Sequence, residues 1–362
     1  MKHVFLYAYD KVNLGDDLFV RTITNRYPQT KFYMWSDLDN RHNFSDISNL
    51  TVIDCHSKVI RGIARIWKSF PARYRAWIEK HCDIMVYIGG SIFAEYSQWE
   101  RYVEWWRKKA VQKPMYILGA NWGPYFTPQY QEGMKEVFGL MKDVCFRDQY
   151  SIEQFQHISS VRYAPDILFA CPIQQKEIKE KQIFVSVIDC GSDDHILLNE
   201  YKEKYIENMS LLLKQYLENG CTLILSSFCK KERDDKAISD IMNNICTHDY
   251  ADNIKVLSYN GTNGKKIIEA ISSSNYVIAT RFHGIVLALA AGRPVLPIVY
   301  SDKTLHMLES ICFDGCLFDL RLDEPFSFDL SKEHWKNYKS LQLKRICDEA
   351  EKHFSKLDRI LK

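Results

Sequence analysis

The sequence has no apolar run approaching the roughly 18 residues that a membrane-spanning helix needs. Its first apolar run, residues 4–9, is short and leads directly into Asp10 and the polar stretch around Asn13. A secretory signal peptide needs a longer apolar segment followed by a small-residue cleavage site, and neither is present. We therefore expect residues 3–9 to form a buried first strand and the protein to be cytoplasmic.

A strong net charge is also lacking. The 48 Lys and Arg residues nearly balance the 46 Asp and Glu residues, which leaves a formal charge of +2. No global electrostatic field therefore favours a polyanion, and we expect no nucleic acid partner. A small anionic substrate would have to be bound by a local cluster of cationic groups instead.

Clustered cysteines are absent as well, although the chain has eleven of them. Their odd number, in a chain without a signal peptide, indicates reduced thiols rather than a disulfide framework. The closest pair, Cys312 and Cys316, has neither a second pair nor a histidine cluster nearby, which argues against structural zinc. No other metal-ligand pattern stands out, so we expect metal-independent chemistry without a cofactor.

The chain does contain an alternation of short apolar runs and helix-period segments along its 362 residues. Its 46% hydrophobic and 26% charged residues are typical of a soluble globular protein, and its length favours two domains. Apolar strands that alternate with helices predict an α/β fold with parallel sheets covered on both faces. Helices are predicted at residues 205–218 and 265–273, and strands at residues 3–9, 31–34, 51–53, 83–88, 115–118, 144–146, 183–187, 222–226, 255–257, 276–279 and 295–299.

A polar segment at residues 173–181 follows Pro172 and precedes a predicted strand, which is typical of an exposed linker. We place the domain boundary there, with residues 1–175 as an N-terminal Rossmann-like domain. Residues 176–362 form the second Rossmann-like domain, with C-terminal helices from Ser331. Ligands of such proteins bind at the carboxyl ends of the strands, in the crevice between the halves. The loops that follow the strands are therefore the candidate site.

The loop after the first predicted strand contains Asn13, Gly15 and Asp16. Gly15 permits a tight turn or a close approach of a ligand. Asp16 can cap the helix predicted at residues 17–25, whose N-terminal amides favour anions. A well-capped helix start explains these residues equally well, so this loop alone does not decide between structure and function.

Two further loops combine glycine with small polar residues. Gly89, Gly90 and Ser91 follow the strand at residues 83–88 and can expose backbone N–H groups to a phosphate or carboxylate. The loop lacks the lysine of a P-loop and matches no GxGxxG pattern, so it gives no support for nucleotide binding. Asn121 lies in a Gly- and Pro-containing turn that fits a cleft-lining loop or an ordinary one.

The strongest motif is Thr280-Arg281-Phe282-His283-Gly284, between a predicted strand and a helix of small residues. An arginine and a histidine at a helix N-terminus combine anion recognition with a proton donor or acceptor. Lys303 follows the next strand and adds a cation at the same sheet edge. Arg147 follows the strand at residues 144–146, where a guanidinium can grip a phosphate or carboxylate with two hydrogen bonds. A surface salt bridge is the alternative for Arg147.

Taken together, these loops resemble the polysaccharide pyruvyl transferase family. No single motif is specific, whereas the ordered set from residue 5 to residue 303 is. One departure is Ser91, where many relatives have a third glycine. The matching motifs are Asn13-x-Gly15-Asp16, Gly89-Gly90, Gly119…Gly123-Pro124, Arg147-Asp148-x-x-Ser151, Pro165-Asp166, Arg281-x-His283-Gly284, Ala288…Ala291-Gly292-x-Pro294 and Tyr300-x-x-Lys303.

This resemblance implies two Rossmann-like domains in a GT-B-like arrangement, with the N-terminal domain on the acceptor side. It also implies that phosphoenolpyruvate is the donor and co-substrate, and that the product is a pyruvate ketal on a glycan. His283 would be the catalytic acid or base, with Asp16 as a further carboxylate that accepts a proton. The donor's anionic groups would be held by Arg147, Arg281, Phe282, Gly284 and Lys303.

Two aromatic stretches bear on the acceptor side. Aromatic residues recur at helical spacing from Phe93 to Trp106, a pattern more typical of a core than of a sugar-stacking platform. Residues 61–77 are basic and aromatic, which fits either a solvated helix or a peripheral contact with an anionic membrane, near a lipid-linked glycan acceptor. The alternatives for the whole chain are a GT-B glycosyltransferase or epimerase that uses a nucleotide sugar, and a non-catalytic glycan-binding subunit.

Overall fold

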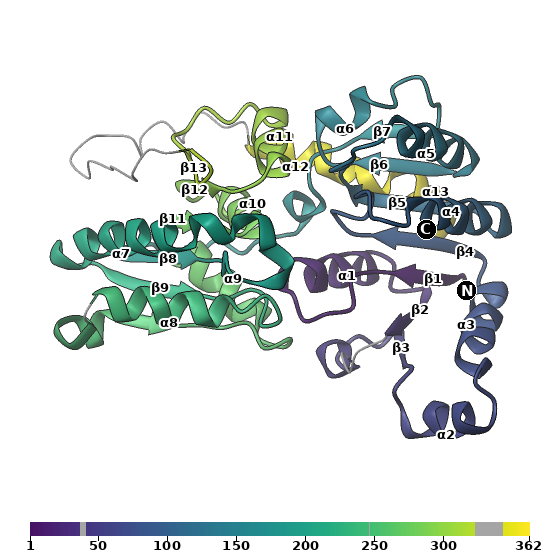
Figure 1. Cartoon of the computed structure of the whole chain (residues 1–362), viewed down its shortest axis with the longest axis horizontal. Coiled ribbons are helices and arrows are strands. Elements are labelled where there is room, and N and C mark those ends of the chain that lie inside the picture. Colours follow the sequence, from purple (N-terminus) through teal and green to yellow (C-terminus); the bar gives the residue numbers. More distant parts are fainter. Residues whose placement is uncertain (37–40, 246, 323–342) are drawn as a thin grey trace. The chain divides into compact units, whose positions relative to one another are not determined.

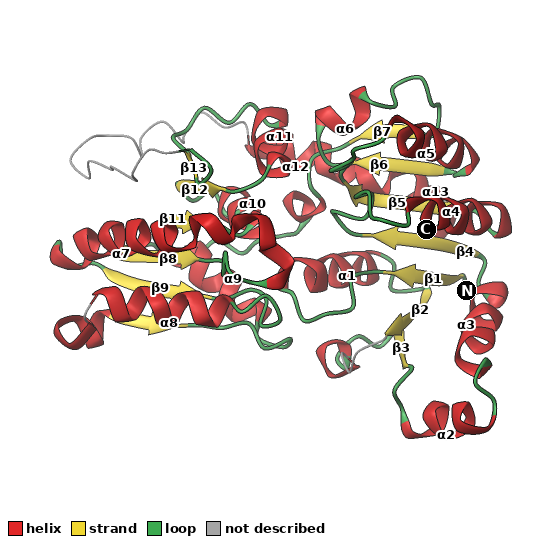
Figure 2. Ribbon diagram, viewed as in Figure 1, coloured by secondary structure: helices red, strands yellow, loops and turns green. Residues whose placement is uncertain are grey.

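The computed structural model describes residues 1–36, 41–245, 247–322 and 343–362, and Figure 1 colours them along the sequence. The chain forms two compact units. Each is built on one parallel sheet flanked by helices (Figure 2). Unit 1 comprises Met1–Lys11, Asp16–Ala170 and Cys347–Lys362, and unit 2 comprises Val12–Gly15 and Cys171–Ile346.

Unit 1 contains a seven-stranded sheet with the order β3-β2-β1-β4-β5-β6-β7. The direction of strand addition reverses between β1 and β4, which makes the carboxyl ends of these two strands the topological switch point. The strands are β1 (His3–Tyr7), β2 (Lys31–Ser36), β3 (Leu50–Asp54), β4 (Ile84–Ile88), β5 (Met115–Ala120), β6 (Asp143–Phe146) and β7 (Val161–Tyr163). The helices are α1 (Leu14–Arg26), α2 (Lys58–Ile66), α3 (Phe70–His81), α4 (Trp99–Gln112), α5 (Pro128–Leu140) and α6 (Gln149–Glu153), with η1 (Arg41–Phe44) and η2 (Ile167–Ala170).

The core of unit 1 is rich in aromatic rings. Phe138 packs edge-on against both Phe93 and Phe155, with ring centroids 4.9 Å apart in each pair. Phe93 and Trp106 are fully buried, whereas Tyr96 keeps 62% of its surface exposed. The aromatic stripe that begins at Phe93 is therefore mainly core, and Tyr96 is its exposed member.

Unit 2 contains a six-stranded sheet with the order β10-β9-β8-β11-β12-β13. Here the switch point lies between β8 and β11, where Thr280 N donates to the Ser186 carbonyl oxygen at 2.9 Å. The strands are β8 (Lys179–Ser186), β9 (Thr222–Ser226), β10 (Ile254–Val256), β11 (Ser274–Ala279), β12 (Val295–Val299) and β13 (Phe318–Asp319). The helices are α7 (Lys202–Glu218), α8 (Asp234–Ile245), α9 (Gly264–Ser273), α10 (Phe282–Ala290) and α11 (Asp302–Ser310), with η3 (Asp193–Tyr201) and η4 (Thr247–Asn253).

The last helices of the chain do not stay within one unit. Helix α12 (Leu343–Ala350) begins in unit 2, whereas η6 (Glu351–Phe354) and α13 (Ser355–Leu361) belong to unit 1. Arg26 of α1 binds Asp358 through Nε at 2.9 Å and through Nη2 at 2.7 Å, and Tyr27 donates to the same carboxylate at 2.7 Å. These contacts tie α13 to the N-terminal residues of unit 1.

The fold class expected from the sequence is confirmed: two parallel sheets alternate with helices, and helices end the chain. The predicted start of the C-terminal helices at Ser331 lies outside the described residues. The eleven predicted strands all occur, and the structure adds the short strands β7 and β13. The unit boundaries differ from the expected division at residues 175 and 176. Unit 1 passes to unit 2 between Ala170 and Cys171, and Cys347–Lys362 return to unit 1.

No helix among the residues that the structure describes has the length and apolar character required to cross a membrane.

Candidate functional site

The motif around His283 lies at the switch point of unit 2, where β11 ends and α10 begins. Arg281 has extended backbone geometry and precedes the first helical residue, Phe282. Gly284 lies directly against β8, because a Cβ atom there would overlap the hydroxyl of Ser186. A larger residue at this position would push the start of α10 away from the sheet. The glycine of the motif therefore sets how closely the helix N-terminus approaches the strand ends.

Arg281 is buried and bound to two carboxylates. Its Nε donates to Asp234 Oδ2 at 2.9 Å, its Nη2 to Asp234 Oδ1, and its Nη1 to Glu232. Only 6% of Arg281 is exposed, and Asp234 is fully buried. The sequence predicted that Arg281 would hold an anion of the donor, but the structure shows its charge already matched by these two carboxylates.

The pKa values in this cluster follow from burial and pairing. Burial raises the pKa of Asp234, and the adjacent Arg281 guanidinium opposes that rise. Burial alone would lower the pKa of Arg281, but Asp234 and Glu232 raise it well above its ordinary value. The guanidinium therefore remains charged.

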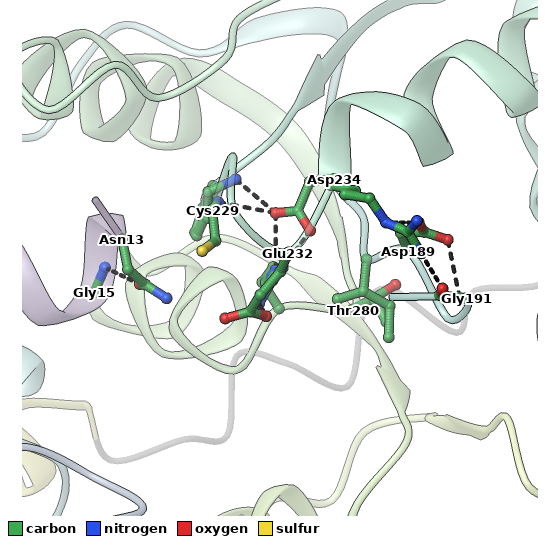
Figure 3. A network of polar contacts seen from close by, with 12 residues as sticks. Asn13, Gly15, Asp189, Gly191, Cys229, Glu232, Asp234 and Thr280 are labelled. Atoms are coloured by element: carbon green, nitrogen blue, oxygen red, sulfur yellow. Dashed lines mark hydrogen bonds and ion pairs between the residues drawn. The ribbon is translucent and has the colours of Figure 1, made fainter. Parts of the chain in front are cut away.

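Asp234 also organises the loop after β9. Its Oδ2 accepts from Phe228 N at 2.9 Å and from Cys229 N at 3.0 Å. Leu14 N in turn donates to the Phe228 carbonyl oxygen at 3.1 Å, and Asn13 forms an isolated antiparallel bridge with Cys229. Figure 3 shows the bonds that Asp234 accepts near Cys229 and, separately, the bond between Asn13 and Gly15. The Asn13 loop is thereby held on the same unit as His283.

Gly15 is in direct contact with His283. Its N–H donates to the side chain of Asn13 at 3.1 Å, which closes a local turn. A Cβ atom on Gly15 would overlap the His283 imidazole ring at Nδ1. Only glycine leaves space for the ring in this position. Gly15 and His283 are 268 positions apart in the sequence (283 − 15). The two motifs that contain them nevertheless meet in unit 2.

Further polar contacts surround the end of β8. Asp189 binds Arg233 Nε at 3.0 Å and accepts from Gly191 N at 2.9 Å. The Tyr205 hydroxyl lies 2.8 Å from the Thr280 hydroxyl, directly before Arg281. Figure 3 shows Asp189, Gly191 and Thr280 beside the Asp234 contacts. Lys303 is in the first turn of α11, with its Nζ 5.7 Å from the ring centroid of Tyr300.

In unit 1, Arg147 joins three of the predicted loops. It donates through Nη1 to Asp166 at 3.0 Å and through Nη2 to Asn121 Oδ1 at 2.8 Å. Ser91 donates to the same Asn121 oxygen at 3.2 Å. A Cβ atom on Gly90 would lie 2.5 Å from Arg147 Nη2, so this glycine makes room for the guanidinium. Only 3% of Arg147 is exposed, and its charge is matched by Asp166, so here too the structure differs from an arginine open to the donor.

The other predicted residues of unit 1 take simpler positions. Gly89 N donates to the Leu118 carbonyl oxygen at 3.2 Å, which continues the pairing between β4 and β5. Asp148 caps α6 by accepting from Ser151 N at 2.7 Å. Helix α1 begins at Leu14, earlier than predicted, so Asp16 lies inside its first turn and does not cap it. Asp16 belongs to unit 1, whereas His283 belongs to unit 2.

The polysaccharide pyruvyl transferase family model matches residues 13–302, which is most of the chain. The chain belongs to this family. The amylovoran biosynthesis protein AmsJ of Erwinia amylovora is 19% identical over 256 residues, which cover 64% of this chain. The match spans 60% of the length of AmsJ.

Solved structures show the same fold as this family member. HepE of Anabaena, in complex with UDP and glucose, has a TM-score of 0.53 at 10% identity, with 100% of this chain and 99% of HepE covered. The UDP-GlcNAc 2-epimerase of Neisseria meningitidis, bound to UDP-GlcNAc, has a TM-score of 0.52 at 11% identity, with 99% of this chain and 100% of the epimerase covered. These likenesses extend over both units and support the GT-B-like fold class.

The acidic residues that bind Arg281 and Arg233 in this pyruvyl transferase family member were not among the candidate residues expected from the sequence. Asp189 follows β8, Glu232 lies in the loop after β9, and Asp234 is the first residue of α8. The charged run Lys230-Lys231-Glu232-Arg233-Asp234-Asp235 after a buried strand was the available signal. Acidic residues are also common in the first turn of a helix, so this run did not by itself identify partners for Arg281.

Proposed function

We propose that this chain transfers the enolpyruvyl-derived group of phosphoenolpyruvate to a sugar of a polysaccharide or its precursor, forming a pyruvate ketal and releasing phosphate. The observation that supports it most directly is the contact between Gly15 and His283, because it unites the first and the last strong family motif at the switch point of unit 2. Ligands of doubly wound sheets bind at that point.

We assign His283 the role of general acid. Ketal formation begins when a proton is added to the methylene carbon of phosphoenolpyruvate, which leaves an oxocarbenium-like centre on the adjacent carbon. One sugar hydroxyl attacks that carbon, phosphate leaves, and a second hydroxyl completes the ketal. The imidazolium of His283 supplies the proton for the methylene carbon. The resulting imidazole, or Asp16, accepts the proton of the first hydroxyl, and the released phosphate takes up the proton of the second.

The donor carries a phosphate and a carboxylate, which require positive partners. We assign these to Lys303, to the backbone N–H group of Phe282 at the start of α10, and to the partial positive charge of that helix end. The N–H of Gly284, which the sequence also suggested, already donates to the Arg281 carbonyl oxygen at 2.9 Å. For Arg281 we propose a positioning role. Its Nε, Nη1 and Nη2 already donate to Asp234 and Glu232, so a donor anion would have to compete with these carboxylates for the guanidinium.

In unit 1 we propose that Arg147 holds the loops of Ser91 and Asn121 in place for the glycan acceptor. Both loops contact the arginine directly or through the Asn121 side chain. The names of two similar proteins support a glycan: AmsJ is described as an amylovoran biosynthesis protein, and the HepE structure contains UDP and glucose. The acceptor sugar can be lipid-linked or nucleotide-linked, and both kinds belong in an acceptor screen.

The proposal is tested by calorimetric titration of the full chain with phosphoenolpyruvate, beside UDP-glucose and UDP-N-acetylglucosamine. Binding of phosphoenolpyruvate, followed by phosphate release in the presence of glycan acceptors, is the expected result. If a UDP-sugar binds and phosphoenolpyruvate does not, the chain is instead a nucleotide-sugar enzyme with the same fold. Sugar binding without turnover of either donor would indicate a non-catalytic subunit.

A further inference from the structure

The helical hairpin of α2 and α3 in unit 1 has an unusual surface. It joins β3 to β4, and Figure 1 shows it extending away from the sheet of its unit, with α2 at the tip. Ile60 is the one buried residue of α2. The remaining residues of that helix therefore keep much of their surface open, although many of them are apolar.

The apolar residues of α2 gather on one side of the helix. Val59, Ile63 and Ile66 are spaced four and three residues apart, which places them on a common face. Val59 is 71% exposed, Ile63 38% and Ile66 93%. Exposure of three aliphatic side chains on one helix face is unfavourable in water and indicates a surface that something else covers.

Aromatic residues continue this surface onto α3. The rings of Trp67, Phe70, Tyr74, Trp77 and His81 follow one another, with successive centroids 4.3 to 6.1 Å apart. Trp67 is 47% exposed and Trp77 is 56% exposed. Tryptophan side chains of this kind favour the boundary between water and lipid, because the ring is apolar while the indole N–H remains polar.

The exposed charged residues of the hairpin are all cations. Residues 57–81 contain seven Lys and Arg residues and one acidic residue, Glu79. Glu79 is 2% exposed and is bound to Arg75 and Lys109. The exposed charges of this segment are the cations Lys58, Arg61, Arg65, Lys68, Arg73 and Lys80. By the roughly 100° rotation per residue of an α-helix, Arg61 and Arg65 lie on the side of α2 away from the aliphatic face, and Lys58 lies at the flank of that face.

We propose that the α2–α3 hairpin docks on the surface of an anionic phospholipid bilayer. The aliphatic face of α2 and the two exposed tryptophans enter the boundary between headgroups and acyl chains. The surrounding cations bind the anionic headgroups, as they do in interfacial amphipathic helices. A soluble polyanion would match the cations but would leave the apolar residues exposed, so the combination favours a lipid surface.

This docking would place the protein where a lipid-linked sugar is presented. The inference does not rest on pyruvyl transfer, because the hairpin residues take no part in the proposed chemistry. Failure of vesicle binding and failure of phosphoenolpyruvate binding are therefore separate outcomes.

The test is co-sedimentation of the full chain with vesicles of phosphatidylcholine alone and with vesicles that also contain phosphatidylglycerol. We expect binding to the anionic vesicles only, and weaker binding at high salt because screening reduces the attraction. The triple variant Arg61→Gln, Arg65→Gln, Lys68→Gln should bind about 100-fold more weakly, since each cation near an anionic surface contributes about a factor of five. The matched control is Lys142→Gln, Lys352→Gln, Lys356→Gln, which removes three exposed charges elsewhere on unit 1 and should bind like the wild type.

The apolar face needs its own variant. The triple variant Val59→Ser, Ile63→Ser, Ile66→Ser should also lose at least about 10-fold in binding, because about 25 cal/mol is lost for each Å² of apolar surface that no longer enters the lipid. Val111→Ser and Phe126→Ser are the controls, since these side chains are 70% and 75% exposed elsewhere on unit 1. Absence of wild-type binding overturns the proposal. So does a serine variant that binds normally, because the contact would then be electrostatic only.

Discussion

The imidazole ring of His283 lies against the backbone of Gly15, so closely that a Cβ atom at position 15 would overlap Nδ1. This contact connects the start of α1 with the start of α10. Both residues belong to unit 2, although Gly15 lies in α1, most of which belongs to unit 1. Gly15 therefore determines the position of His283, the proposed general acid.

The first prediction concerns this contact. Gly15→Ala should displace His283 and reduce turnover of phosphoenolpyruvate by at least about 100-fold, because small misplacements of reacting groups are costly. Phosphate release measures the effect. Gly62→Ala is the control, because nothing lies within 4 Å of a Cβ atom there, and this helical substitution should stabilise the protein by about 0.5–1 kcal/mol. Full activity of Gly15→Ala would show that the ring position does not matter.

The second prediction concerns proton transfer. His283→Gln should lower the turnover number by about 10²- to 10⁴-fold, the usual contribution of a general acid. Binding of phosphoenolpyruvate should persist, because the variant retains the N-terminal amides of α10 and Lys303. Calorimetry and phosphate release together separate these effects. A variant that turns over normally would exclude His283 as the acid.

The third prediction concerns the ion pairs of Arg281 with Glu232 and Asp234. Arg281→Met should destabilise the protein by about 3–5 kcal/mol, because two buried or half-buried carboxylates lose their cation. Asp234→Asn should also destabilise it, because two backbone N–H groups and the guanidinium share that carboxylate. In urea unfolding, the double variant should lose less than the sum of the single variants, with a coupling of about 1–3 kcal/mol. If the losses in the free energy of unfolding simply add, Arg281 and Asp234 do not stabilise each other.

The fourth prediction compares two adjacent glycines. A Cβ atom on Gly90 would lie 2.5 Å from Arg147, whereas one on Gly89 would have its nearest contact, Ile92, at 3.4 Å. Gly90→Ala should therefore cost about 1–3 kcal/mol of stability, as overpacking in a buried site usually does. Gly89→Ala should cost less. If thermal unfolding shows the same loss of stability for both variants, the contact with Arg147 is not the reason for a glycine at position 90.

The fifth prediction concerns acid stability. His353 is fully buried, and its Nε2 lies 2.8 Å from the Pro165 carbonyl oxygen. Burial lowers the pKa of this imidazole from 6.5 to about 3. Between these values the unfolded chain binds a proton that the folded chain does not, so the free energy of unfolding falls as pH falls. Lowering the pH from 7 to 5 should cost about 2 kcal/mol through this group.

His353→Gln should show a smaller loss between pH 7 and pH 5 than the wild type, whatever its absolute stability. Urea unfolding at the two pH values measures the difference. His56→Gln is the control, because His56 is exposed and its replacement leaves the core intact. If wild type and His353→Gln lose the same free energy, the imidazole is not responsible.

The strands were predictable because buried parallel strands are apolar along their whole length. Thr222–Ser226 and Val295–Val299 have the bounds that the apolar runs indicated. The missed strands are Val161–Tyr163 and Phe318–Asp319, which lie at sheet edges and contain three and two residues. Segments that short have too little periodicity to be recognised without their neighbours.

The sequence by itself determined the fold class, the family and the positions of the motif loops at strand ends, because all of these follow from local patterns of residues. The tertiary structure decided what the charged side chains bind. Arg281 meets Asp234 and Glu232 from 47 and 49 positions away, and Arg147 meets Asp166 from 19. It also decided that the aliphatic face of α2 stays exposed. Local pattern shows that a residue is charged or apolar, whereas its partner depends on which distant segments the chain brings together.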